Sequence, residues 1–293
     1  MAEAKAKETL SKAPKKGPQA KPDLASLGGV VLGVGGILGG MVLEKGELHD
    51  LYQITAFIIV MGGTIGAVMV TTPMGILARA AKHLSLVFFD KVHSASETIE
   101  EIIGYATQAR KQGIVSLEQQ ANNVHDPFLK KALNLAVDGI EMSQIRSIME
   151  LDLSLVEQDG EAEAKVYEAA GGYAPTIGII GAVIGLIHVM KDLGNIDAVG
   201  RGIAAAFVAT IYGVGSANLF FLPAGSKLRS RMHDAVRIRE LMLEGVLAIV
   251  EGLNPKLIRT KLEAYLQQQA AAEAKTKAVK KGKAAAEPVS AEG

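Results

Sequence analysis

The sequence predicts an all-α, polytopic membrane protein with four transmembrane helices and a helical cytoplasmic domain. Three observations support this prediction: four long apolar runs, a positive mean hydropathy of +0.24, and an unusual composition. The 293 residues include 32 glycines, 4% aromatic residues and no tryptophan. Many glycines and few aromatic residues are typical of closely packed membrane helices rather than of an aromatic-rich globular core.

Each apolar run is long enough to be considered as a membrane span. The first run is uncharged and 20 residues long, so as a helix it would cover about 30 Å, the thickness of the hydrocarbon layer. The third is nearer the lower limit and contains one ionisable residue, His188. The four runs are 24–43, 51–71, 174–190 and 202–223.

The first run is expected to be a retained anchor rather than a cleaved signal peptide. It has a basic flank, but it is long for a signal sequence and a second span follows after a short loop. Small residues spaced four apart, such as Gly29 and Gly33, favour close helix packing. A nucleotide-binding loop is disfavoured because no β-α-β pattern surrounds these glycines.

The distribution of basic residues predicts the orientation. Six lysines precede the first span and a basic segment follows the fourth, whereas the loop between the first two spans holds one lysine, Lys45. Both termini and the long central segment are therefore expected in the cytoplasm.

The polar segments are predicted to be helical or disordered. Ser94 with Glu97 forms a capping box, and Asp126 before Pro127 marks another helix start. Ser116 is expected to cap a short helix. The predicted organisation is a basic disordered leader (1–23), a transmembrane hairpin (24–72), a helical cytoplasmic domain (73–173), a second hairpin (174–224), C-terminal cytoplasmic helices (225–266) and a disordered Lys/Ala-rich tail (267–293).

Several functional classes are disfavoured. The absence of cysteine excludes disulfides, thiolate metal sites and a cysteine nucleophile. The six histidines are scattered, and the chain has no HExxH motif, Walker loop or GxSxG motif. The sequence therefore predicts no enzyme activity, no cofactor, no metal site and no nucleic-acid partner.

The polar residues within the spans suggest ion conduction with help from a partner. The fourth span contains Thr210, Tyr212 and Ser216, but no predicted span contains Asp or Glu. A proton or cation path through lipid needs a carboxylate or an equivalent group, which a partner helix would supply. Two alternatives remain open: the hydroxyls could bond their own helix carbonyls, and His188 could simply reach the outer interface.

Several segments, in order, resemble the MotA family of ion-conducting stator subunits of the bacterial flagellar motor. They cover residues 24–266. The matching segments are LGGVVLGVGGILGG, IVMGGTIGAVMVTTP, YAPTIGIIGAVIGLIHVMKDL, GIAAAFVATIYGVGSANLFFLPAGSKL and GVLAIVEGLNPKLIRTKLEAYL.

This resemblance implies roles for individual residues. Arg110 and Glu118, in QARKQGIVSLEQQ, would engage the rotor protein FliG. Without the resemblance, the two residues would be interpreted as part of a solvated helix face. Thr210 would face the ion path. Ala182 stands where sodium-driven members tend to carry Thr, and alanine offers no oxygen ligand, which favours protons. Pro175 and Pro223 would couple ion flow to conformational change.

The resemblance also implies partners and a mechanism. Five copies would surround two helices of a single-span MotB-type protein, which carries the membrane Asp and anchors to the cell wall. The basic ends could bind membrane lipid or act only as solubilising tails. The alternatives are an ExbB/TolQ-type energiser of outer-membrane processes and a non-conducting scaffold. Two spans before the cytoplasmic domain argue against the former, since that group has one.

Overall fold

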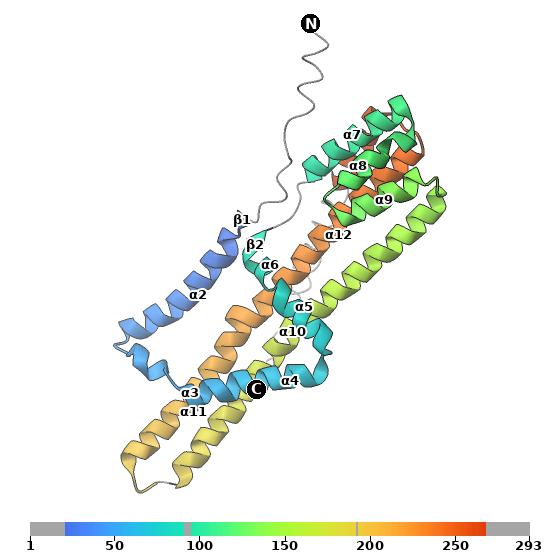
Figure 1. Cartoon of the computed structure of the whole chain (residues 1–293). Helices are drawn as coiled ribbons and strands as arrows, with labels where there is room; N and C mark the ends of the chain where they lie inside the picture. The colour runs from blue at the N-terminus through green and yellow to red at the C-terminus, as the bar shows by residue number, and fades with distance from the viewer. Residues whose placement is uncertain (1–20, 91–94, 192, 268–293) are drawn as a thin grey trace, which may run out of the picture. The chain divides into compact units, whose positions relative to one another are not determined.

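A computed structural model describes residues 21–90, 95–191 and 193–267 of the chain (Figure 1). The chain divides into two compact units. The first unit combines Met1–Val92 with Val156–Asp234, and the second combines His93–Leu155 with Ala235–Gly293.

The first unit holds the apolar helices. Its N-terminal part contains β1 (Lys21–Pro22), α2 (Leu24–Leu43), the 3-10 turn η1 (Leu48–Leu51), α3 (Ile54–Phe57), the π-helix η2 (Ile58–Gly62), α4 (Gly63–Thr71), α5 (Met74–His83), α6 (Ser85–Phe88) and β2 (Phe89–Asp90). Its later part contains α11 (Ile196–Ser216) and the π-helix η4 (Ala217–Phe221). The two-residue strands β1 and β2 pair antiparallel.

The second unit is helical throughout its described residues. It contains α7 (Ala95–Gln112), the 3-10 turn η3 (Ile114–Leu117), α8 (Glu118–Asn123) and α9 (Pro127–Val137), and residues 255–267 form a further helix. Two long helices belong to both units because their residues fall on either side of the division. They are α10 (Met142–Lys191) and α12 (Leu222–Val250).

Four helical segments of the described chain are long and apolar enough to cross a membrane, which confirms the predicted fold class. The helices extend beyond the predicted third and fourth spans at the prolines. Pro175 lies inside the 50-residue helix α10 rather than at its start. Pro223 lies one residue into α12, and the helix does not stop there.

The widened turn η4 comes directly before Pro223 and suggests how the helical path accommodates it. Proline has no backbone N–H, so the carbonyl of Leu219, four residues earlier, lacks its α-helical donor. A π-helical turn at this point lets the chain remain helical despite the missing hydrogen bond. Within α10, Pro175 likewise leaves the carbonyl of Gly171 without its α-helical N–H donor.

The first apolar helix begins at a charged cap and is otherwise uncovered. The Asp23 carboxylate accepts hydrogen bonds from the backbone N–H groups of Ala25 and Ser26 at 3.1 and 3.3 Å. No residue of α2 is buried within the described chain. Only Gly33 among its glycines comes within contact distance, where an added Cβ would lie 3.0 Å from the Leu219 side chain. The remaining glycines of α2 face open space.

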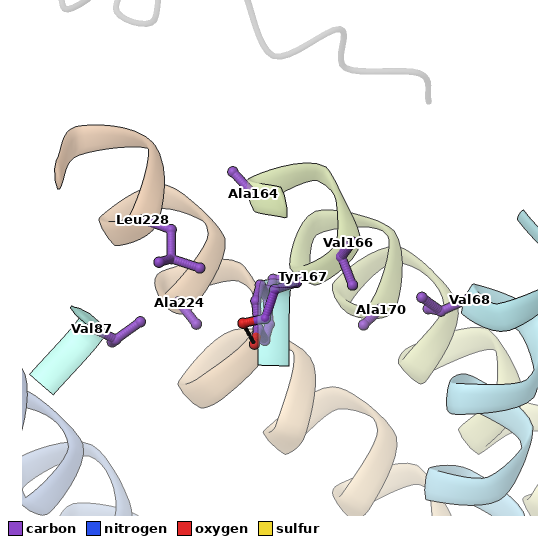
Figure 2. Close-up of a cluster of buried hydrophobic side chains, with 9 residues drawn as sticks. Val68, Val87, Ala164, Val166, Tyr167, Ala170, Ala224 and Leu228 are labelled. Atoms are coloured by element: carbon purple, nitrogen blue, oxygen red, sulfur yellow. Dashed lines mark hydrogen bonds between the residues drawn. The ribbon is translucent and has the colours of Figure 1, made fainter. Parts of the chain in front are cut away.

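The core of the first unit forms where α10, α12 and α5 meet. Figure 2 shows Tyr167 and Ala170 of α10 facing the same cluster as Ala224 and Leu228 of α12. The Tyr167 hydroxyl donates a 2.9 Å hydrogen bond to the Ala80 carbonyl, so the one polar group of the cluster is satisfied. This contact fixes α5 against α10.

In the second unit, the predicted helix start at Asp126 is confirmed, with its carboxylate accepting from two backbone N–H groups and Pro127 in the first turn. The prediction for Ser116 is wrong. Ser116 lies inside η3, and its hydroxyl donates to the Gly113 carbonyl because the chain makes a 3-10 turn before α8 begins. The expected capping box at Ser94 lies outside the described residues, as do leader residues 1–20 and tail residues 268–293.

Candidate ion-conducting site and cytoplasmic contact surface

The hairpin of α10 and α11 brings two helix backbones into direct contact. A Cβ added to Gly178 would lie 2.9 Å from the Ala209 carbonyl oxygen, and one added to Gly213 would lie 2.6 Å from the Ala174 carbonyl oxygen. A Cβ on Gly185 would meet Ala206 at 3.2 Å. Glycine and alanine along both helices therefore let the two backbones approach closely, as small residues do between helices in lipid.

Two of the predicted ion-path residues lie beside this contact line. Ala182 and Thr210 each follow a contact residue, since a Cβ on Gly181 would lie 2.9 Å from the Ala209 side chain. Both are half-buried. The Thr210 hydroxyl donates to the Ala206 carbonyl at 3.3 Å, and the Ser216 hydroxyl donates to the Gly213 carbonyl at 3.2 Å. Each hydroxyl thus satisfies its donor within its own helix and keeps its lone pairs as acceptors.

Tyr212 has a specific structural contact. Its hydroxyl hydrogen-bonds the Leu51 carbonyl and receives a 3.4 Å hydrogen bond from the Gln53 N–H. Its ring meets Phe57 edge-on, with centroids 6.1 Å apart. In this structure Tyr212 therefore holds the start of the second span against α11.

His188 lines a cavity of about 610 Å³ among the second, third and fourth spans. Gln53, Thr55 and Arg201 contribute the other polar side chains of its wall. His188 itself is exposed and lies three residues before the end of α10.

A buried hydroxyl lies in the second span. Thr64 is 0% exposed, and its Oγ1 has no hydrogen-bond partner among the described residues. It follows the π-helix η2. A serine or threonine inside a regular helix usually bonds the carbonyl of the preceding turn, and the altered geometry before Thr64 gives a reason why it does not.

The start of the first span carries an ion cluster that sequence reasoning missed. The Asp23 carboxylate lies 2.5 Å from Lys227 Nζ and 2.9 Å from Arg231 Nη2, both on α12. The hydrogen bond from Lys227 and those from the start of α2 hold the pKa of Asp23 well below its usual value. The cluster ties the beginning of α2 to α12. An Asp directly before an apolar run is a recognisable cap, but its two partners lie about 200 positions away in sequence.

A second cluster fixes α5 to α10. Glu163 is buried, and its two oxygens face His83 Nδ1 at 2.6 Å and Arg79 Nε at 3.4 Å. Arg79 also pairs with Asp159 at 2.9 Å. The part of α10 from Glu157 to Glu163 carries four acidic residues, and Glu163 is the buried, paired carboxylate among them.

The predicted rotor-contact residues lie on either side of the η3 turn in the second unit. Arg110 is in the last turn of α7, and Glu118 is the first residue of α8. Both side chains are exposed. Neither forms an ion pair with any residue that the structure describes, whereas Arg146 and Arg259 of the same unit pair with Glu244 and Glu100. The second unit therefore exposes two charges that form no ion pair with its other described residues.

Four apolar helical segments, a close α10–α11 hairpin bearing hydroxyls, and a unit with exposed charges define a membrane ion-channel subunit. Comparison with known proteins agrees with this class. Residues 27–112 match the family model described as motility protein A N-terminal, and residues 120–241 match the MotA/TolQ/ExbB proton channel family.

Similar curated and solved proteins cover most of the chain. Motility protein A of Bacillus subtilis (strain 168) is 37% identical over 248 residues, spanning 83% of this chain and 91% of that protein. Chemotaxis protein PomA of Vibrio alginolyticus is 32% identical, spanning 84% and 96%.

The solved structure of C. jejuni MotAB matches with a TM-score of 0.79 and 34% identity, over 83% of this chain and 95% of that chain. The flagellar MotAB stator complex from Bacillus subtilis matches with a TM-score of 0.76 and 36% identity, over 82% and 95%. The chain belongs to the motility protein A family. The expected identity as a MotA-type, ion-conducting flagellar stator subunit of the inner membrane is confirmed, and the ExbB/TolQ alternative is not supported.

Proposed function

We propose that this chain, paired with a MotB-type protein, conducts protons across the inner membrane and converts their flow into torque on the flagellar rotor. The observation that carries the proposal is the chemistry of the spans. Residues 24–43, 54–71, 174–191 and 202–216 contain hydroxyls and a histidine but no Asp or Glu. An ion path through them needs a carboxylate from another chain. The role is transport and mechanical work, without catalysis.

The partner and the assembly follow from surfaces that the single chain leaves uncovered. The α2 helix has no buried residue, and large apolar side chains such as Ile180 and Phe207 on α10 and α11 are more than half exposed. Helices in lipid associate through packing of small residues, which both helices supply. The solved relatives are MotAB complexes, and we infer the family arrangement of five copies around two partner helices.

We infer protons as the conducted ion from the side chains beside the helix contact. Sodium is a hard cation that needs several oxygen ligands. Ala182 supplies a methyl group and no oxygen, so the predicted path beside the helix contact offers only the hydroxyl oxygens of Thr210 and Ser216. Two hydroxyl oxygens are fewer ligands than a dehydrated sodium ion needs, whereas each can accept a hydrogen bond from a protonated water or a carboxylic acid.

Coupling is proposed to run through the two helices that belong to both units. α10 contains Pro175 and α12 contains Pro223, and each proline removes one backbone hydrogen bond from a continuous helix. Such points bend at lower cost than an intact helix. A change at the partner carboxylate could thus alter the helices that lead to the cytoplasmic unit.

Rotor engagement is assigned to Arg110 and Glu118, which are exposed and without ion-pair partners in the described chain. FliG is the proposed partner, and both termini are placed in the cytoplasm by the distribution of lysine and arginine. In this orientation the basic leader faces the inner leaflet, where it could add affinity for anionic lipid.

The proposal is tested by expressing the chain with a MotB-type partner in cells that lack their own stators. Swimming that ignores external sodium and stops with a protonophore is the expected result. Sodium-dependent swimming would overturn the proton assignment and the reasoning on Ala182. A correctly inserted complex that conducts no ion would favour a scaffold instead.

Charge reversal tests the rotor contact in the same cells. Arg110→Glu should impair swimming while membrane insertion and ion conduction stay intact. Lys256→Glu is the matched control, because Lys256 is also exposed and belongs to the same unit. Loss of insertion in Arg110→Glu, or equal impairment in both variants, would argue against a specific rotor contact.

A further inference from the structure

The turn between the two proposed rotor-contact charges exposes an apolar side chain. Val115 lies in η3, between Arg110 and Glu118 in sequence, and is 64% exposed. No other large apolar side chain of the described part of the second unit is more exposed; Leu151 reaches 59% and Leu257 reaches 53%. The Val115 side chain is therefore mostly uncovered within the described chain.

The turn that carries Val115 is held rigidly from beneath. Leu117 is 0% exposed and anchors the end of η3 in the core of the unit. The Gln108 side chain donates a 2.9 Å hydrogen bond to the Ser116 carbonyl, and the Ser116 hydroxyl donates a 2.6 Å hydrogen bond to the Gly113 carbonyl. Gly113 has φ +80, a conformation that favours glycine. Val115 is therefore presented in a fixed position, which lowers the entropy cost of binding.

The charges around Val115 have a definite order. Arg110 and Lys111 come before the turn and Glu118 comes after it, and all three are exposed. None forms an ion pair with a described residue. Exposed charges contribute little affinity by themselves but steer and orient a partner. Protein interfaces gain most of their affinity from a few apolar or aromatic groups inside a polar rim.

We propose that Val115 is the apolar anchor of the rotor contact, and that Arg110, Lys111 and Glu118 form its charged rim. The inference rests on the proposed function, because it takes the partner to be the rotor surface that this turn meets. That surface would offer an apolar socket, with an acidic group facing Arg110 and Lys111 and a basic group facing Glu118. Gln108 is a positioning residue, since its side-chain amide donates to the backbone of the turn and accepts from the Gln120 side chain.

The first test measures binding of the purified rotor ring protein to the full stator complex in membranes. Val115→Ser removes the apolar group without adding charge, and Val115→Ile keeps it. We expect Val115→Ser to weaken binding about tenfold, as loss of an interface anchor does, and Val115→Ile to retain it. Leu257→Ser is the control, since it removes a comparably exposed apolar side chain from the same unit and should leave binding unchanged.

The second test uses the absence of cysteine in this chain. With a cysteine-free MotB-type partner, Val115→Cys provides a single thiol in the complex. Its reaction with a maleimide should slow when the rotor ring protein is added, whereas the same reaction in Leu257→Cys should not change. This readout reports contact directly and does not depend on motility.

The outcomes separate the anchor from the proposed function. If Arg110→Glu weakens binding while Val115→Ser does not and the Val115→Cys thiol stays equally reactive, the anchor is refuted and the rotor contact stands. If Arg110→Glu and Val115→Ser both leave binding unchanged, the rotor contact itself is refuted and the anchor with it. Weakened binding in Val115→Ser together with protection of the thiol supports the proposal.

Discussion

The close contact between α10 and α11 predicts that one methyl group at Gly213 will damage the hairpin. A Cβ at this position would lie 2.6 Å from the Ala174 carbonyl oxygen and 3.0 Å from the Gly178 Cα. Both neighbours are backbone atoms, so no side-chain rotation relieves the clash. Ordinary contact begins at 3.4 Å, so the two helices would have to separate locally by 3.4 − 2.6 = 0.8 Å.

The size of the effect follows from the known cost of overpacking, about 1–3 kcal/mol for one extra methyl group in a tightly packed site. Replacing glycine by alanine also favours the helix by up to about 1 kcal/mol, which would partly hide the clash. Gly215→Ala corrects for this effect. Gly215 lies two residues further along α11, and its added Cβ would meet nothing within 4 Å.

The assay is thermal unfolding of the purified stator complex in nanodiscs, with the two alanine variants measured side by side. Gly213→Ala should melt below Gly215→Ala by about 2–4 °C for each kcal/mol of clash. Gly178→Ala should behave like Gly213→Ala, because its Cβ would lie 2.9 Å from the Ala209 carbonyl oxygen. Equal melting of Gly213→Ala and Gly215→Ala would refute the packing described for this hairpin.

Two further predictions concern the ion pairs. Burial alone would raise the pKa of Glu244, but hydrogen bonds from Arg146 and Lys261 outweigh it and lower the pKa below the usual 4.5. The folded state then binds a proton less readily than the unfolded state, so this stabilisation is present above pH 4.5 and is lost as the pH falls below it. Glu244→Gln should flatten that part of the acid-unfolding curve, and an unchanged curve would contradict the pairing. Arg79→Ala should destabilise the protein more than Asp159→Ala in denaturant unfolding, because it leaves the buried Glu163 with only His83, whereas Asp159 is exposed. The reverse order would argue against a buried, paired Glu163.

The main features of the fold could be predicted from local sequence pattern. The length and lack of charge of an apolar run such as 24–43 predict a membrane helix, and no tertiary contact is needed for that prediction. The cap at Asp126 was predictable for the same reason, because Asp followed by Pro acts within one turn. Pro175 and Pro223 do not end their helices, because a proline removes only one backbone hydrogen bond. The π-helical turn η4 precedes Pro223 and keeps the chain helical there.

The candidate site was only partly predictable. Arg110 and Glu118 were found through a resemblance, since their composition alone describes any solvated helix face. The exposure of Val115 between them depends on the burial of Leu117 and the bond from Gln108, and neither follows from spacing along the chain. The partners of Asp23 could not be predicted, because an ion pair across about 200 residues leaves no local pattern.

The sequence by itself determined the four membrane-spanning helices and the lack of Asp and Glu within the apolar runs, because hydropathy and residue type are local properties. Only the tertiary structure decided which glycines touch a neighbouring backbone, which charges are paired and which side chains remain exposed. Gly213 and Gly215 are identical residues on the same helix. A Cβ added to Gly213 would meet a backbone carbonyl, whereas one added to Gly215 would meet nothing within 4 Å. That difference depends on helix rotation and crossing geometry, which many distant contacts set together.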